Sequence, residues 1–150
     1  MKITFLKQFM IMEKTFRICS EEEMKIVSLY ILKKMNKNQV VLLKGELGSG
    51  KTTLVRSFAK LIGIDKVMSP TFNFLYIYEN EKMKISHADL YRIESIKHVR
   101  ELNLEETIEQ SAITFIEWAE NAGTLFDVYN PIRIEMEFSG ECREVRILWQ

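Results

Sequence analysis

The chain has 150 residues, enough for one domain with a substantial hydrophobic core. Lysine plus arginine equals aspartate plus glutamate at 21 each, so no global positive field favours nucleic acid. No apolar run approaches the length that spans a bilayer, and no secretory cleavage site follows the first residues. We therefore predict a globular cytoplasmic protein that contacts RNA only locally or through a partner.

Recognisable structure begins after an N-terminal extension. Residues 1–11 are predicted to lie outside the core, with Met12 as an alternative translation start, and residues 12–150 to form a single domain. Residues 14–19 are predicted to form a short strand. Ser20 followed three residues later by Glu23 is typical of a capping box, which predicts a helix that continues to about Met35.

A glycine-rich segment is the most informative feature of the chain. Residues 45–52, GELGSGKT, complete the pattern G-x-x-x-x-G-K-[ST]. The apolar run 40–43 before it predicts a buried strand, and apolar residues recur at helical spacing over 51–62 until Gly63. A strand, a glycine loop and a helix form the setting in which this motif binds phosphates.

The chemistry of such a loop follows from its backbone. N–H groups point at phosphate oxygens, and the N-terminus of the helix adds partial positive charge. Lys51 is predicted to reach the β- and γ-phosphates and Thr52 to ligate Mg²⁺, whereas Thr53 either supports the α-phosphate or is an ordinary helix residue. We therefore predict binding of a nucleoside triphosphate by Glu46, Leu47, Gly48, Ser49, Gly50, Lys51, Thr52 and Thr53.

The middle of the chain changes pattern after the glycine loop and its helix. Residues 74–78 and 83–88 are predicted strands joined by a polar turn, hence an antiparallel hairpin. Residues 90–110 are rich in glutamate and leucine and predict one or two short helices. An apolar strand at 112–116 ends at Glu117.

The C-terminal part completes the predicted sheet. A short helix is expected near 119–125, and strict alternation over 132–138 is typical of a half-exposed strand. The turn at 139–141 leads into a last strand at 143–149. The predicted fold class is therefore α/β, a P-loop NTPase-like mixed β-sheet with helices on its faces and a C-terminal antiparallel hairpin.

Three residues outside the loop are candidates for a hydrolytic site, which needs carboxylates and a group that senses the γ-phosphate. Glu117 ends an apolar strand, where it would hold Mg²⁺ through water or orient the attacking water. Asp89 ends the hairpin strand and would support the same cation, and Thr71 follows a proline and would complete the metal site as switch threonines do. The predicted catalytic residues are Lys51, Asp89 and Glu117, and the predicted metal ligands are Thr52, Thr71, Asp89 and Glu117.

Alternatives stay open for three neighbouring residues. His87 is interpreted as a packed or capping histidine rather than a base. Arg92 either stabilises charge on the γ-phosphate or pairs with Asp89. Trp118 is either a buried anchor or part of the nucleotide site.

The chain has two cysteines, Cys19 and Cys142, far apart and without metal-ligand spacing. A disulfide framework is not expected from this pattern. We predict two structural thiols in a reducing compartment.

Four motifs together resemble one bacterial family. Residues 45–53 (GELGSGKTT), 69–72 (SPTF), 87–92 (HADLYR) and 116–120 (IEWAE) occur in the order and spacing of the TsaE family, formerly YjeE. That family is the small ATPase of tRNA threonylcarbamoyladenosine synthesis. Ser49 stands where the family often has alanine, and the N-terminal extension is a second departure.

The resemblance implies a P-loop α/β fold, ATP and Mg²⁺ as ligands, and weak Mg-dependent ATP hydrolysis that partner proteins activate. It also implies association with the TsaB–TsaD heterodimer, which transfers a threonylcarbamoyl group to the adenosine next to the anticodon. The ATPase is expected to reset that complex between turnovers and to meet tRNA only indirectly or through the complex. By resemblance, Thr71 and Asp89 lie in two switch-like loops, and Glu117 is the acid at the metal site.

The sequence also bears on three other functions of a glycine-loop protein. A small-molecule kinase needs a lid with arginines, and residues 90–110 contain only Arg92 and Arg100. A nucleotide-gated interaction module without essential hydrolysis is an open alternative. A GTPase is disfavoured, because no N-K-x-D motif follows the glycine loop.

Overall fold

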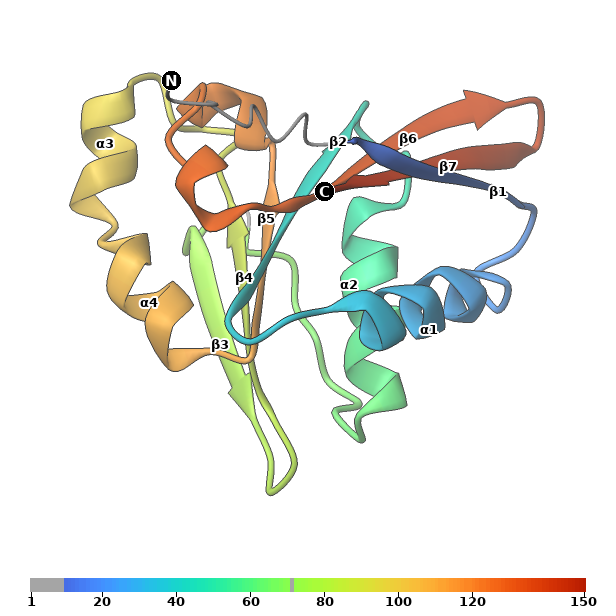
Figure 1. Ribbon diagram of the computed structural model, residues 1–150, viewed down its shortest axis with the longest axis horizontal. Helices are drawn as coiled ribbons and strands as arrows, with labels where there is room; N and C mark the ends of the chain where they lie inside the picture. The colour runs from blue at the N-terminus through green and yellow to red at the C-terminus, as the bar shows by residue number, and fades with distance from the viewer. Residues whose placement is uncertain (1–9, 71) are drawn as a thin grey trace, which may run out of the picture.

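The computed structural model describes residues 10–70 and 72–150. Within them the chain forms a seven-stranded sheet in the order β1-β7-β6-β2-β5-β4-β3 (Figure 1). The strands are β1 (Met12–Ile18), β2 (Gln39–Gly45), β3 (Leu75–Glu79), β4 (Lys84–Asp89), β5 (Ile113–Glu117), β6 (Ile132–Ser139) and β7 (Cys142–Trp149). The α-helices are α1 (Met24–Lys34), α2 (Lys51–Leu61), α3 (Ile96–Glu101) and α4 (Leu104–Gln110), with 3₁₀ turns η1 (Ala119–Ala122) and η2 (Asp127–Tyr129).

The sheet is mixed, as predicted. Strands β6, β2, β5 and β4 run parallel to one another, whereas β3 and β4, β6 and β7, and β1 and β7 pair antiparallel. Both predicted hairpins are therefore confirmed. The predicted helix near 119–125 forms instead as the single 3₁₀ turn η1, since Trp118 and Gly123 at its two ends adopt positive φ.

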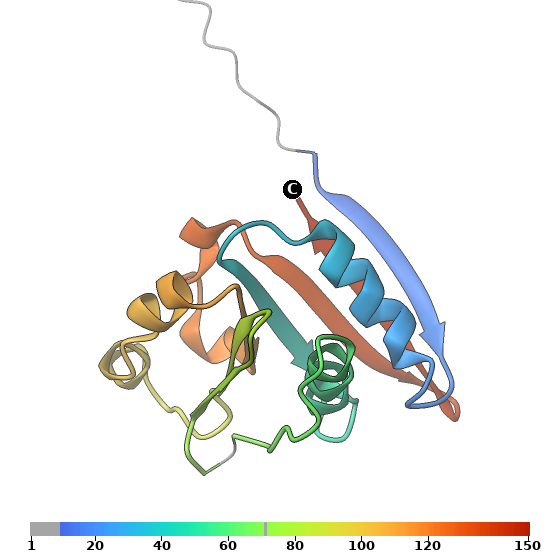
Figure 2. The same ribbon diagram turned by 90° about the horizontal axis from the view of Figure 1, so that it is seen from below.

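Helices cover both faces of the sheet. Figure 2 shows α1 and α2 on one face and α3 and α4 on the other. Strand β2 lies at the centre, so its side chains alternate between two cores: Val41 and Leu43 face α1 and α2, whereas Val40 and Leu42 face the opposite layer. Burial on both faces explains why this strand is a continuous apolar run.

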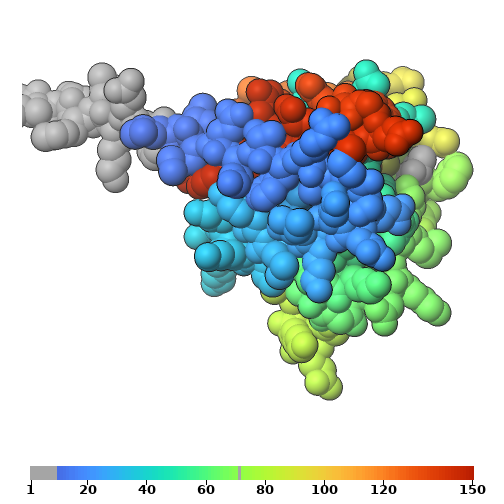
Figure 3. Space-filling view, turned by 90° about the vertical axis from the view of Figure 1, so that its right-hand side faces the viewer, coloured from blue at the N-terminus to red at the C-terminus, as the bar shows by residue number. Residues whose placement is uncertain are grey.

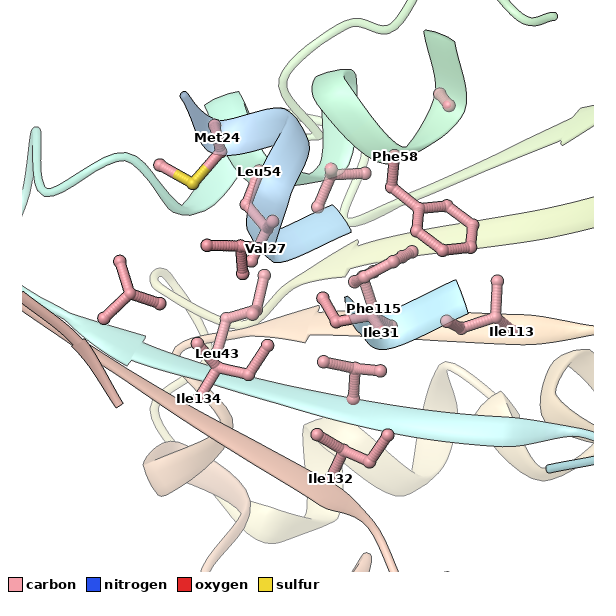
Figure 4. Packing of buried hydrophobic residues seen from close by; sticks show 14 of the residues in the cluster. Met24, Val27, Ile31, Leu43, Leu54, Phe58, Ile113, Phe115, Ile132 and Ile134 are labelled. Atoms are coloured by element: carbon pink, nitrogen blue, oxygen red, sulfur yellow. The ribbon is translucent and has the colours of Figure 1, made fainter. Parts of the chain in front are cut away.

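The larger core lies beneath helices α1 and α2 (Figure 4). It contains Met24, Val27 and Ile31 of α1, Leu54 and Phe58 of α2, and Leu43, Ile113, Phe115, Ile132 and Ile134 of the strands. Phe58 and Phe115 meet edge to face, with their ring centroids 5.2 Å apart. This packing fixes α2 against the centre of the sheet, directly after the loop.

The predicted capping residues lie just before helix α1. The Glu23 N–H donates to Ser20 Oγ at 3.2 Å, and Glu23 Oε2 accepts from the Cys19 N–H at 2.6 Å. The reciprocal bond therefore reaches one residue further back than in a standard capping box. Residues 21–23 form a turn with i→i+3 bonds, so the helix itself begins at Met24.

The prediction of two free thiols is wrong, because Cys19 and Cys142 form a disulfide. Strand β1 pairs antiparallel with β7 up to Ile18, which stands opposite Arg143, so the next position brings the two cysteines together. Figure 3 shows the first strand in blue beside the last in red. The bond joins residues 123 positions apart, a contact that follows only from pairing the first strand with the last.

Two further expectations concern the chain's ends and the bilayer. The predicted extension at 1–11 lies almost entirely outside the described residues, and β1 begins at Met12. Among the residues that the structure describes, no helix is long and apolar enough to cross a membrane.

Candidate functional site

The glycine loop joins the carboxyl end of β2 to the first residue of α2. Gly48 and Gly50 have φ angles of +79° and +107°, in the left-handed region that glycine tolerates best. Gly45 is needed for another reason, since a Cβ there would lie 2.5 Å from Ser49 Oγ and 2.7 Å from the carbonyl oxygen of Met136. The predicted strand, loop and helix are therefore confirmed in their local geometry.

Lys51 stands at the first position of α2 and is buried, with 4% of its surface exposed. Its ammonium donates to the carbonyl oxygens of Gly45 at 2.6 Å and Glu46 at 3.0 Å, and lies 4.5 Å from the centre of the Trp118 ring. Burial lowers the pKa of this amine, while the charges of nearby carboxylates, first that of Glu117, act in the opposite direction. The amine is thus held at the loop by neutral acceptors and a π-face.

Glu117 is the centre of a buried network at the carboxyl end of β5. Its Oε1 accepts a hydrogen bond from Thr52 Oγ1 at 2.7 Å and lies 2.8 Å from His87 Nε2. Only 4% of Glu117 is exposed, and His87 is fully buried. For His87 to bond to a carboxylate, its Nε2 must carry the hydrogen. Glu117 Oε1 therefore accepts two hydrogen bonds, one from His87 on β4 and one from Thr52 on α2.

His87 is therefore packed, as interpreted, but it also contacts a predicted catalytic carboxylate, which sequence reasoning missed. Its Nδ1 is buried without a hydrogen-bond partner among the described residues. The two-residue period of a strand could have predicted the contact between His87 and Glu117, because residues 87 and 89 of β4 must face the same side of the sheet. Adjacent β5 runs parallel and ends at the same edge, in register from Ile113 to Glu117.

Asp89 ends β4 directly beside the end of β5, where it pairs in register with Glu117. Its Oδ1 accepts from the Tyr91 N–H at 2.9 Å, and 5% of the residue is exposed. Burial raises the pKa of the Asp89 carboxyl, and the bond from Tyr91 opposes this shift. Two carboxylates thus meet at the carboxyl edge of parallel strands, the common position of ligands in α/β sheets.

Contacts of the neighbouring residues bear on two of the open alternatives. The Trp118 ring lies under the Lys51 ammonium and 4.9 Å from the Tyr91 ring, so it is next to the glycine loop. Arg92 lies with its guanidinium 4.7 Å from the centre of the Phe72 ring, and among the described residues no ion pair joins it to Asp89. Thr53 lies in the first turn of α2, half-buried.

The structure thus brings together four predicted residues, Lys51, Thr52, Asp89 and Glu117, within one edge of the sheet. The fifth, Thr71, lies outside the described residues. These groups fit a magnesium-bound nucleotide: glycines that clear space for the loop, a buried ammonium, a hydroxyl and two buried carboxylates. No group of three or more His, Cys, Asp and Glu side chains in the described part of the chain could hold a metal alone. Mg²⁺ commonly combines one or two carboxylates with phosphate oxygens and water.

Two hollows flank the loop. One of about 470 Å³ lies between Gly45, Trp118 and the β6 residues up to Phe138, and four glutamates line it. The other, about 270 Å³, lies between residues 48–50 of the loop and the segment that carries the disulfide. The loop is therefore open to space on either side.

A glycine loop between a central parallel strand and a helix, with two acids at the adjacent strand ends, defines a P-loop NTPase-like α/β protein. The model of one such family, "Threonylcarbamoyl adenosine biosynthesis protein TsaE", matches residues 18–146. The chain belongs to this family, which confirms the resemblance noted in its motifs.

Individual relatives agree with the family match. The chain is 39% identical over 103 residues to the tRNA threonylcarbamoyladenosine biosynthesis protein TsaE of Rickettsia conorii, and the match spans 67% of this chain and 58% of that protein. It is 31% identical over 105 residues to the protein of the same name from Bacillus subtilis, across 69% of this chain and 65% of that protein. The match thus covers less than two thirds of either relative.

A solved structure supports the fold. The crystal structure of YdiB from Bacillus subtilis aligns with a TM-score of 0.74, covering 93% of this chain and 87% of that one at 24% sequence identity. At this level of identity, the likeness bears on the fold alone.

Proposed function

We propose that this protein binds Mg-ATP at the glycine loop, hydrolyses it slowly, and serves as the ATPase of tRNA threonylcarbamoyladenosine synthesis in the cytoplasm. Its partner is the TsaB–TsaD heterodimer, which carries out the transfer to adenosine, and it meets tRNA through that complex. The observation that carries the proposal is the single Glu117 oxygen that accepts from both Thr52 and His87 beside the loop.

The roles of the residues follow from their positions. Loop N–H groups and the Lys51 ammonium hold the phosphates. On binding, phosphate oxygens would take the place of the Gly45 and Glu46 carbonyl oxygens to which the Lys51 ammonium donates. Thr52 and Glu117 would hold Mg²⁺, which when bound neutralises charge on the β- and γ-phosphates. Thr71 is proposed as a further ligand from its motif alone.

Hydrolysis requires a water directed at the γ-phosphorus. Glu117 is the residue we assign to orient that water, because its carboxylate is held in one direction by two donors. His87 acts as a positioning residue through Glu117. Asp89, whose pKa is raised by burial, supports the cation or accepts a hydrogen bond from the water.

Zero formal net charge agrees with a protein that works through protein partners rather than by holding tRNA itself. Slow hydrolysis by the chain alone and acceleration by its partners are part of this proposal. In related chemistry an arginine supplied by a partner accelerates phosphoryl transfer by several orders of magnitude.

The test of the pathway is a nucleoside assay. Depletion of the protein in cells should lower threonylcarbamoyladenosine in total tRNA, measured by mass spectrometry of digested tRNA. The wild-type gene should restore the nucleoside and a Lys51→Ala gene should not. Unchanged nucleoside levels after depletion would refute the assignment to this pathway.

The test of the reaction is phosphate release from Mg-ATP by the purified chain. The rate should be low alone and rise when the TsaB–TsaD pair and tRNA are added. Phosphorylation of a small acceptor, with no response to these partners, would favour the kinase alternative. Full restoration of the nucleoside in cells by a Glu117→Gln variant without turnover would favour the nucleotide-gated interaction module.

A further inference from the structure

The hollow beside the disulfide lies on the opposite side of the loop strand from the two acids. Sheet order places β5 and β4, which carry Glu117 and Asp89, on one side of β2, and β6, β7 and β1 on the other. The hollow is lined on that second side by residues of the loop and by the ends of β1 and β7. It therefore belongs to a part of the site that the acids do not reach.

The direction of a nucleotide on the loop follows from this arrangement. With the γ-phosphate toward Glu117, the α-phosphate and the nucleoside must leave toward the other side of β2. Thr53, the residue after the proposed magnesium ligand, lines the hollow at that end. The hollow thus begins where the phosphate chain of a bound nucleotide would end.

The lining of the hollow is mixed in chemistry. Its side walls come from the turn before α1 and from the start of β7, and they include Ser20, Glu21, Met24, Glu141 and Arg143. Carboxylates and hydroxyls suit the hydroxyl groups of ribose, whereas a thioether and a guanidinium plane suit the face of a base. Such a combination fits a nucleoside better than a further phosphate.

The disulfide forms part of the same wall. Cys19 lines the hollow, and Cys142 stands between Glu141 and Arg143, which also line it. The bond between the two cysteines joins the turn before α1 to the first residue of β7. The next residue, Arg143, extends from β7 to the loop, with its Nη2 3.4 Å from the Gly48 carbonyl oxygen and its guanidinium 4.2 Å from the centre of the Phe138 ring. One covalent bond therefore fixes the two segments that face the loop across the hollow.

We propose that the redox state of Cys19 and Cys142 sets the affinity of this hollow for the nucleoside end of the nucleotide. The inference rests on the proposed binding of ATP. With the disulfide formed, the two walls are held together before the ligand arrives, so less ordering is needed on binding. With the disulfide reduced, β1 stays paired with β7 along its length, and only the turn after Ile18 is released.

The exchange reaction balances without a metal. Cys19 is exposed and Cys142 is buried, so the thiolate of a dithiol reductant attacks Cys19 Sγ and the Cys142 thiolate leaves and takes up a proton. The second thiol of the reductant then attacks the mixed disulfide and frees Cys19. Two electrons pass to the protein, and the reductant becomes a disulfide; glutathione disulfide drives the reverse reaction.

This assignment gives a disulfide a function in a reducing compartment. Disulfides are rare in the cytosol, and those that form there are usually transient and redox-sensing. A bond that only strengthened the fold would be lost in such a setting. A disulfide that borders a ligand site can instead make the affinity for the ligand depend on the redox state of the compartment.

The test compares the full-length protein with the disulfide formed by glutathione disulfide and after reduction by dithiothreitol. Thiol titration verifies the two states, and calorimetry measures Mg-ADP and Mg-pyrophosphate with each. We expect the oxidised protein to bind ADP roughly three- to tenfold more tightly, as the ordering of one or two side chains would give. Pyrophosphate, which lacks the nucleoside, should bind equally to both.

A matched variant separates the bond from other effects of the reductant. The double substitution Cys19→Ser with Cys142→Ser should bind ADP like the reduced protein and ignore dithiothreitol. Equal ADP affinity of the two redox states, or cysteines that glutathione disulfide cannot join, would overturn the redox control. An equal change for pyrophosphate would overturn the nucleoside assignment. Failure of both states to bind any nucleotide would instead refute the proposed function.

Discussion

Substitution of Gly45 by alanine is the sharpest test of how the loop is built. Gly45 is the only one of the six glycines whose φ is not positive, so its importance lies in space rather than in backbone conformation. The added Cβ would lie 2.5 Å from Ser49 Oγ and 2.7 Å from the Met136 carbonyl oxygen. The first atom is on a side chain, but the second belongs to the backbone of β6, which pairs with β2 at this position.

The expected cost follows from these two contacts. Forcing an additional methyl group into a packed site typically costs about 1–3 kcal/mol. For a domain of this size that corresponds to a fall in Tm of roughly 2–12 °C. The loop is the part that can move, since β6 is held on both sides. We therefore expect nucleotide affinity to fall by roughly tenfold or more, because about 1.4 kcal/mol of strain or misalignment suffices for each factor of ten.

The assay pairs thermal unfolding with calorimetric titration of Mg-ADP. Gly63→Ala is the matched control, since it makes the same change beyond the far end of α2, where the new atom would meet only Asn80 Nδ2, at 3.6 Å. Its φ of +88° should cost about 1–2 kcal/mol, but away from the loop, so nucleotide affinity should be kept. Adding Ser49→Ala to Gly45→Ala should recover only part of the loss. A Gly45→Ala protein with wild-type Tm and affinity would refute this account of the loop.

Three other substitutions test the site. Lys51→Ala should weaken Mg-ATP binding by roughly 10- to 150-fold, the value of a hydrogen bond to a charged group, and a fluorescent nucleotide that still binds with native affinity would contradict this. His87→Ala should lower turnover by roughly 10- to 100-fold at unchanged nucleotide affinity, which is the usual effect of removing a group that hydrogen-bonds to a metal ligand. His87→Gln keeps a hydrogen-bond donor and should restore part of the turnover. Loss of nucleotide affinity in both variants would indicate a merely structural role. Asp89→Asn keeps the acceptor for the Tyr91 N–H but removes a charge whose burial raises the pKa of Asp89, so it should stabilise the protein above the folded-state pKa. That gain in Tm should shrink as pH falls through the folded-state pKa and vanish below the ordinary pKa of 3.8, where the wild-type carboxyl is protonated in both the folded and the unfolded protein. A gain independent of pH would exclude the buried charge as its cause.

The glycine loop and its flanks could be predicted because each part is encoded locally. Burial of β2 on both faces leaves a continuous apolar run, and the left-handed residues at positions 48 and 50 require glycine. Helix α2 follows with apolar residues at helical spacing, which the core beneath it confirms. Neither observation needs knowledge of the strand order.

The boundaries of local elements were less predictable where a turn competed with a helix. Ser20 and Glu23 form the expected cap, but the residues between them form a turn with i→i+3 bonds, so α1 begins at Met24. The segment after Trp118 has helical composition yet forms only 3₁₀ turns. Its ends are set by residues with positive φ, which no periodicity reveals.

The two sides of the site differ in how far the sequence encodes them. Asp89 and Glu117 could be placed together because each ends a strand whose parallel neighbour ends at the same edge, so the motif order already implies the contact. The contact of Cys19 with Cys142 depends instead on the first strand lying beside the last, an arrangement with many alternatives before the sheet is known. The same pairing shapes the hollow on that side of the loop. The end of the site that we propose for phosphate and metal is thus encoded in short motifs, whereas the opposite end forms only when residues 123 positions apart in the chain are brought together.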